Sequence, residues 1–143
     1  FLAILEDANP EKVASLCLMH DVGEIRIGDV HRIGSKYLGD TKPAERNAIL
    51  DQTENLPLKI KTHMRNLWDE FHDQKTFESH LARDADLLET MIEAKEYLDT
   101  GYKAAKRWLE NGSKYLKTES AKKFFKEMEK TQFSDWWDHL NKV

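Results

Sequence analysis

Apolar residues recur at steps of three and four positions along most of the chain, which is the spacing of one face of an α-helix. The pattern predicts helices over residues 1–5, 10–24, 43–56, 57–73, 77–100, 102–112, 120–130 and 134–140. No segment shows the strict alternation of a half-buried strand, and no repeat or low-complexity tract interrupts the pattern. The sequence therefore predicts an all-α fold.

Residues at the ends of these segments support the helix assignments. Asn9 is a suitable N-cap, and Thr76 is a suitable cap for the longest helix, which Gly101 would end. Residues 29–43 contain two glycines and a proline and predict a loop. Asn-Gly-Ser at 111–113 predicts a turn between two of the later helices.

The composition is that of a helical globular protein, with 34% charged residues but only six glycines and three prolines. A chain of 143 residues is most simply one domain, spanning 1–143. The net charge of −4 gives no general attraction to nucleic acid or to an anionic membrane. No apolar stretch approaches the roughly 20 residues of a membrane-spanning helix. We therefore expect neither nucleic acid nor a membrane as a partner.

Two further features bear on the setting of the protein. The single cysteine, Cys17, excludes an internal disulfide and fits a reducing compartment, so we expect a cytoplasmic protein. The opening residues, Phe-Leu-Ala-Ile-Leu, lack an initiator methionine and resemble the last turns of a helix. We therefore expect residues upstream of Phe1 and an N-terminal helix that is truncated in this chain.

Four ionisable residues gather where the apolar run of residues 10–24 ends, namely His20, Asp21, Glu24 and Asp29. On the predicted helix, His20 and Glu24 share a face because four residues make about one turn. A neutral imidazole with carboxylates suits a divalent transition metal better than calcium, which prefers oxygen ligands alone. A histidine and its neighbouring carboxylates alone would bind an ion only weakly, so further ligands must come from elsewhere in the chain.

The longest predicted helix offers two carboxylates, Asp84 and Asp86, as a further ligand. Asp84 shares a helix face with Leu81 and Leu88, whereas Asp86 lies on a more polar face with Glu89. Periodicity alone therefore favours Asp84 as the residue that points toward the interior.

The spacing His-Asp-x-x-Glu-x-x-x-Gly-Asp resembles the motif of the HD-domain metal-dependent phosphohydrolases, and most closely their 5′-deoxynucleotidase branch. In this chain the motif is filled by His20, Asp21, Glu24, Gly28 and Asp29. The resemblance continues through "LPLKIKTHMRNLWDEF" and "DADLLETMIEAKEY", and it covers most of the chain up to about residue 100. The glutamate and the second aspartate make it more specific than a bare His-Asp pair. The resemblance implies an all-α helical bundle.

The resemblance also implies a site for one divalent ion, such as Mn²⁺ or Co²⁺, bound by four residues. Three of these ligands would be His20, Asp21 and Asp86. Asp86 is preferred because the distal aspartate of the family directly precedes an apolar pair, and Asp84 is kept as the alternative. The remaining histidine ligand, and an arginine near the substrate phosphate, are expected upstream of the first residue.

The implied reaction is the hydrolysis of a nucleoside 5′-monophosphate, with a preference for deoxynucleotides, by a metal-activated water. Glu24 would orient or deprotonate that water, and Asp29 would assist the proton transfer or protonate the leaving 5′-oxygen. The sequence does not say which of the two residues takes which role. A homodimer is expected from the same resemblance.

Two other functions stay open at this stage. One is a non-catalytic helical interaction module that kept the fold without the site, and the other is a phosphodiesterase or nucleotide pyrophosphohydrolase. The remaining polar and aromatic residues near the motif are assigned ordinary structural roles. Surface or loop positions are expected for His31, His63, His72, His80 and His139, solvated charges for Arg26, Arg32, Lys36 and Glu70, and core or interface positions for Trp108, Trp136 and Trp137.

Overall fold

The computed structural model describes residues 1–138 and 140. Its elements are α1 (Leu2–Leu5), α2 (Pro10–Met19), α3 (Glu24–Ile27), α4 (Arg32–Leu38), α5 (Lys42–Thr53), α6 (Leu58–Asp73), α7 (Phe77–Asp99), α8 (Lys106–Gly112), α9 (Glu119–Met128) and α10 (Asp135–Asp138). Two 3₁₀ turns, η1 (Lys103–Ala105) and η2 (Ser113–Tyr115), flank α8. The described residues form no strand, so the predicted all-α fold is confirmed.

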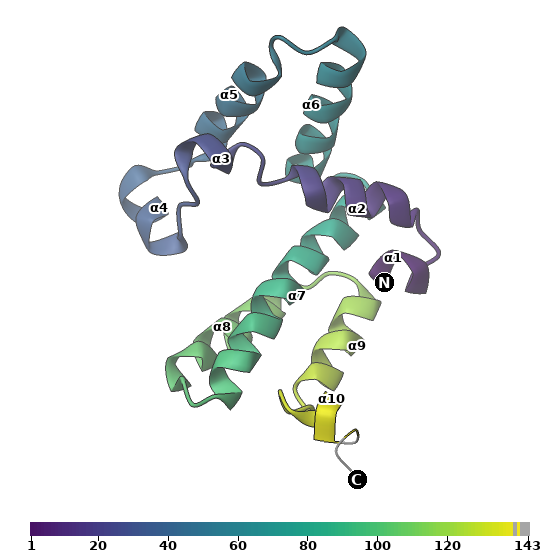
Figure 1. Cartoon of the computed structure of the whole chain (residues 1–143), viewed down its shortest axis with the longest axis vertical. Helices are drawn as coiled ribbons and strands as arrows, with labels where there is room; N and C mark the ends of the chain where they lie inside the picture. The colour runs from purple at the N-terminus through teal and green to yellow at the C-terminus, as the bar shows by residue number, and fades with distance from the viewer. Residues whose placement is uncertain (139, 141–143) are drawn as a thin grey trace.

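Helix α7 is the longest element, and most of the others are arranged along it (Figure 1). Helices α2 and α6 pack against its N-terminal half, and α8 and α9 pack against the rest. Its start is fixed as predicted, because the Thr76 hydroxyl accepts a hydrogen bond from the Ser79 backbone N–H and the Ser79 hydroxyl accepts one from the Thr76 N–H. Gly101 follows its end with a φ of +103°.

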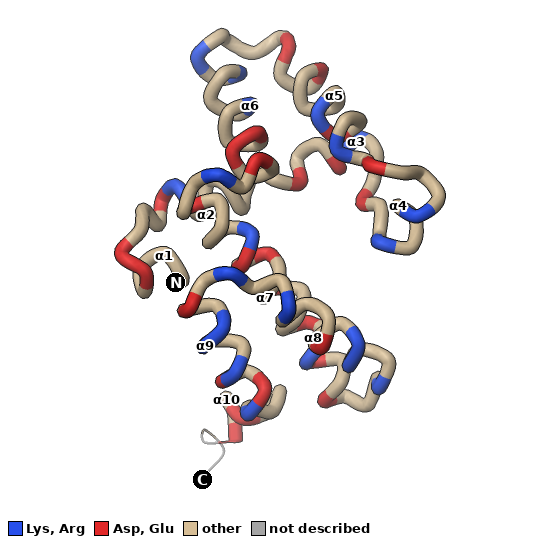
Figure 2. The backbone as a smooth tube through the Cα atoms, turned by 180° about the vertical axis from the view of Figure 1, so that it is seen from behind, with Lys and Arg blue, Asp and Glu red and all other residues tan. Residues whose placement is uncertain are grey.

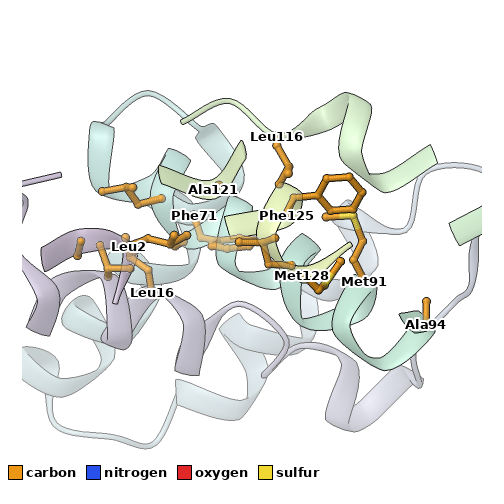
Figure 3. Packing of buried hydrophobic residues seen from close by; sticks show 14 of the residues in the cluster. Leu2, Leu16, Phe71, Met91, Ala94, Leu116, Ala121, Phe125 and Met128 are labelled. Carbon is orange, nitrogen blue, oxygen red and sulfur yellow. The ribbon is translucent and has the colours of Figure 1, made fainter. Parts of the chain in front are cut away.

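The hydrophobic core runs along the face of α7 that these helices cover (Figure 3). Leu16 of α2 and Leu81 of α7 are completely buried, and Phe71 of α6 and Phe125 of α9 extend the same cluster. Gly112 of α8 lies so close to Met91 of α7 that an added Cβ would sit 2.7 Å from the methionine sulfur. Packing of α2 and α6 on α7 is what places the polar end of α2 beside the middle of α7.

Three predicted boundaries are wrong. Helix α2 ends at Met19 instead of continuing to residue 24, and the chain turns through residues 20–23 before α3 begins. The predicted loop 29–43 contains α4 and the first residues of α5. The Asn-Gly-Ser segment does not form the predicted turn: it ends α8 and begins η2. Gly112 stands inside the helix because the Met91 side chain leaves no room there for a Cβ.

Charged residues of both signs are mixed along the helices (Figure 2), in keeping with the small net charge of the chain. No helix among residues 1–138 is both long and apolar enough to cross a lipid bilayer.

Candidate functional site

His20 is the C-cap residue of α2 and directly follows its last residue, Met19. Its Nδ1 lies 2.6 Å from the backbone carbonyl of Cys17, one turn earlier, and its ring packs on Phe71 with centroids 4.5 Å apart. A carbonyl only accepts hydrogen bonds, so Nδ1 is the protonated donor, and the other ring nitrogen, Nε2, faces the polar site. The fixed carbonyl therefore sets both the tautomer and the direction of the imidazole.

Two carboxylates approach this Nε2 atom from different parts of the sequence. Asp21 Oδ2 lies 2.9 Å away, and Asp86 Oδ1, on α7, lies 3.4 Å away. Nε2 is buried, yet neither contact has the direction of a hydrogen bond. Burial lowers the pKa of His20, but the two carboxylates and the Cys17 carbonyl outweigh it and raise that pKa to about 10.

Asp84 and Asp86 occupy different environments although only one residue separates them. Asp84 is completely buried and accepts hydrogen bonds from the backbone N–H groups of Lys117 and Thr118 and from the Thr118 hydroxyl, at 2.7–3.1 Å. Those bonds attach the segment before α9 to α7. The periodicity argument correctly placed Asp84 in the interior, but it is Asp86 that the fold brings to His20.

Asp86 also contacts a cation on its own helix, because Arg83 Nη1 lies 2.8 Å from Asp86 Oδ2. Burial raises the pKa of Asp86, but the His20 imidazole and the Arg83 guanidinium overcome that effect and leave the pKa below its ordinary value. Asp86 is therefore a carboxylate at neutral pH. The Arg83 side chain is half exposed, so it is accessible beside the two acidic groups.

Glu24 and Asp29 stand on the far side of the turn that follows α2. Glu24 begins α3, and its backbone N–H donates to the Asp21 carbonyl at 2.9 Å, which fixes the turn. Partial burial, together with the carboxylates of Asp21, Asp29 and Glu45, raises the pKa of Glu24 to about 7. Asp29 is exposed and follows Gly28, whose φ is +81°. A carboxyl that titrates near neutrality can both accept and donate a proton at physiological pH.

The donors around His20 suit a divalent transition metal, because one imidazole nitrogen and two carboxylates form a mixed nitrogen and oxygen set. The buried Nε2 atom without a directed hydrogen bond is the structural observation that fits such a group. In the part of the chain that the structure describes, no three or more His, Cys, Asp or Glu side chains are arranged so that they could hold a metal ion. His20, Asp21 and Asp86 therefore match the ligand chemistry of a metal site but are not assembled into one.

Two residues beside the site were missed in the sequence. Glu45 of α5 is buried, with its Oε2 3.9 Å from His72 Nε2 of α6, and the His72 ring stacks on Trp68 at 3.8 Å. The predicted surface position of His72 is wrong, and its place four residues after Trp68 on the apolar stripe of α6 was the available signal. No local pattern marked Glu45, because its neighbours come from other helices.

Other residues near the motif have structural contacts. Glu70 pairs with Lys12 at 2.8 Å and accepts a hydrogen bond from Thr76, Arg26 pairs with Asp51, and the exposed Arg32 donates to the Tyr115 hydroxyl at 2.9 Å. Trp108 and Trp136, expected in the core or at an interface, are 61% and 68% exposed, so they lie outside the core, and an interface position stays a prediction. His139 lies outside the described residues.

Comparison with known proteins gives one family and a set of related hydrolases. The sequence model of the family described as HD domain matches residues 2–129. The protein named 5′-deoxynucleotidase HDDC2 from Dictyostelium discoideum is 33% identical over 86 residues, which cover 60% of this chain and 45% of that protein. Those of the same name from Danio rerio (30% over 89 residues; 62% and 44%) and Homo sapiens (26% over 95 residues; 66% and 47%) are also similar.

The chain thus spans less than half the length of the curated relatives it matches. No solved structure matches it.

Proposed function

The chain belongs to the HD domain family, and on that premise we propose that it is a metal-dependent phosphohydrolase that releases phosphate from nucleoside 5′-monophosphates. The relatives named 5′-deoxynucleotidase support this substrate class and favour the deoxynucleotides within it.

One observation carries it: His20 Nε2 is buried and faces the carboxylates of Asp21 and Asp86 without a directed hydrogen bond to either. A neutral imidazole lone pair beside two anions is unfavourable unless a cation lies among them. A bound proton satisfies that need, and so does a divalent metal ion, for which imidazole and carboxylate are common ligands. We assign His20, Asp21 and Asp86 as three ligands of such an ion.

When bound, a divalent ion would polarise the phosphate and make a water molecule acidic near neutral pH. We assign Glu24 the role of taking the proton of the attacking water, and its pKa of about 7, raised by burial and by the carboxylates of Asp21, Asp29 and Glu45, supports this role. Asp29 is exposed, and its charge acts on Glu24, so we assign it the assisting role of relaying the proton taken by Glu24 toward the leaving 5′-oxygen. Glu45, which lies 3.9 Å from His72, is a further carboxyl whose charge acts on Glu24.

The substrate is a dianion that must approach a group of carboxylates, so it needs a cationic contact of its own. Arg83 is bound to Asp86 through one nitrogen, and its side chain is 47% exposed. Its remaining N–H groups can bind phosphate oxygens without breaking that contact. We propose that Arg83 holds the phosphate near the site, which predicts a raised KM when its charge is removed.

Phosphate release by the purified protein tests the proposal. With Mn²⁺ or Co²⁺ added, a panel of ribo- and deoxynucleoside 5′-monophosphates should yield phosphate and the nucleoside, and a chelator should stop the reaction. Glu24→Ala should lose at least a hundredfold in kcat while retaining the ion, which elemental analysis measures. Glu89→Ala, an exposed glutamate of α7, is the matched control. Absence of phosphate release from every nucleotide would contradict the proposal.

A second function has one observation in its favour. Among the described residues, no group of three or more His, Cys, Asp or Glu side chains could hold a metal ion, as expected of a non-catalytic interaction module on the same scaffold. Metal analysis separates the two, because such a module need hold no ion. A nucleotide pyrophosphohydrolase or phosphodiesterase would be recognised by its products in the same assay. A single domain over 1–143, a homodimer and a cytoplasmic location stay predictions.

A further inference from the structure

A second polar and aromatic feature lies along α7, away from the charged groups at His20. A cavity of about 230 Å³ opens between the C-terminal half of α7 and the η1–α8 segment. It is lined by Thr90, Glu93, Ala94, Tyr97, Tyr102, Ala105 and Trp108. The two alanines are almost fully buried and form the floor, whereas the three aromatic rings are between half and two-thirds exposed and form the walls. The cavity is therefore shallow and presents mainly aromatic surface.

The helical repeat places this cavity on the same face of α7 as Asp86. Thr90 follows Asp86 by four residues, Glu93 by seven and Tyr97 by eleven, so all four lie on one stripe of the helix. The Thr90 hydroxyl contacts the Asp86 backbone carbonyl at 3.3 Å. Seven residues of α-helix rise about 10 Å, which is about the length of a nucleoside 5′-monophosphate. A ligand with its phosphate at Asp86 would reach the cavity with its other end.

The residues that line the cavity suit a flat, partly polar group at the end of the ligand opposite the phosphate. Three aromatic side chains offer faces on which a planar ring can stack, and Tyr97 and Tyr102 are held edge to face with centroids 6.2 Å apart. Among the described residues that line the cavity, Glu93 is the only ionisable acid or base apart from the tyrosines. Its carboxylate can accept hydrogen bonds from the N–H groups of a base edge.

We propose that this cavity receives the nucleobase of the substrate, stacked on Trp108 and the two tyrosines and hydrogen-bonded to Glu93. The inference rests on the proposed function for its phosphate end, but the binding of a base can be measured without any reaction. It implies that base recognition comes from α7 and α8, and that the sequence motif at His20 takes no part in it.

Kinetics with and without a base give the first test. Trp108→Leu should raise the KM for a deoxynucleoside 5′-monophosphate at least fivefold and leave kcat within twofold. The same variant should leave kcat/KM for 2-deoxyribose 5-phosphate, which has no base, unchanged. Trp136→Leu is the matched control, because Trp136 is similarly exposed but lies in α10, outside the cavity. If the parent protein hydrolyses the base-free phosphate as well as the nucleotide, the proposal is overturned.

Nucleoside binding gives a second test that does not depend on catalysis. Deoxyguanosine added to the ¹⁵N-labelled protein should shift the indole N–H resonance of Trp108, identified by its loss in Trp108→Leu, and Glu93→Gln should weaken binding at least threefold. An unmoved Trp108 resonance overturns the proposal, as does self-association through this cavity that Trp108→Leu abolishes in sedimentation. Nucleoside binding without phosphate release from any substrate would instead contradict only the proposed reaction.

Discussion

Asp84 and Asp86 are carboxylates on the same helix whose surroundings give them opposite tasks. Asp84 accepts four hydrogen bonds from Lys117 and Thr118 in the interior, and Asp86 faces His20 at the site. We predict that Asp84→Ala lowers the free energy of unfolding by about 2–4 kcal/mol, because it leaves buried donors without an acceptor. Urea denaturation in the presence of chelator measures this change.

Asp86→Ala should affect ion binding more than stability. It should weaken the affinity for Mn²⁺ at least tenfold in a calorimetric titration. With chelator added, it should change the free energy of unfolding by less than Asp84→Ala does. If Asp84→Ala were the variant that lost the ion while its fold stayed intact, the assignment of Asp86 as the ligand would be wrong.

Glu24 gives a prediction about pH. Its folded pKa of about 7 lies above the ordinary value of 4.5, so the folded state favours the protonated form. Its contribution to stability is therefore complete below about pH 4.5 and is lost as the pH rises through 7. Glu24→Gln should then be more stable than the parent at pH 8, by about 1–2 kcal/mol after allowance for partial exposure, and equally stable at pH 4.5.

Melting temperatures measured with chelator between pH 4.5 and 8.5 check this difference. Glu89→Gln, whose side chain is exposed, should follow the parent at every pH. A Glu24→Gln curve that runs parallel to the parent curve would show that the Glu24 carboxyl is not perturbed.

The site could be predicted from the sequence only where its members are close neighbours or match a family motif. The spacing from His20 to Asp29 marked one part, and the family resemblance chose Asp86 where periodicity favoured Asp84. Glu45 and His72 were missed because α5 and α6 bring them to the site by packing, and no short spacing connects them to His20. The exposed aromatic residues of the cavity could not be recognised as functional from the sequence, because a stripe of aromatic residues is also typical of a core.

At the scale of elements, the turn between α2 and α3 depends on one close approach. A Cβ on Gly23 would lie 2.8 Å from the backbone carbonyl oxygen of Glu45 in α5. We predict that Gly23→Ala costs about 1–3 kcal/mol of stability, because backbone atoms of α5 would have to move. Since Glu24 follows directly, the variant should also reduce turnover.

Gly112→Ala is the comparison for this prediction. Its Cβ would meet the side chain of Met91, which can change rotamer, and alanine favours the helix that contains it. Its cost, measured by the same urea denaturation, should be below that of Gly23→Ala. Equal costs would indicate that the approach of α5 to Gly23 does not constrain the turn.

Helices with strong local signals were predicted well, and those shaped by contacts were not. The start of α7 follows from Thr76 and its end from Gly101, both of which act within a few residues. The end of α2 was placed too late because no breaker precedes Gly23, and the turn is formed by contact with α5. Helix α4 was predicted as loop because it contains Gly34 and buries no residue that would reveal a periodic face.

At the scale of the molecule, one polar contact attaches α4 to the C-terminal half among the residues that the structure describes. The guanidinium of Arg32 donates to the Tyr115 hydroxyl at 2.9 Å and lies 5.4 Å from the ring centroid of the same tyrosine. We predict that Tyr115→Ala increases amide hydrogen exchange in α4 severalfold while it changes overall stability by less than about 1 kcal/mol, since both groups are exposed.

Hydrogen exchange followed by mass spectrometry measures this effect peptide by peptide. Tyr37→Ala removes an exposed tyrosine of α4 that has no such contact, and it should leave exchange in η2 unchanged. Unaltered exchange of α4 in Tyr115→Ala would mean that other contacts position α4.

The hydrogen bond from His20 to the Cys17 carbonyl fixes the imidazole to α2. A shift of α2 along α7 therefore changes the distance between His20 Nε2 and Asp86 Oδ1 without rotating the ring. Leu16 and Ala82 are completely buried where α2 packs on α7. Conservative substitutions at these two positions should therefore lower ion affinity before they lower overall stability. If His20 and Asp86 bind an ion as proposed, the affinity for that ion therefore reports how closely the apolar faces of α2 and α7 pack.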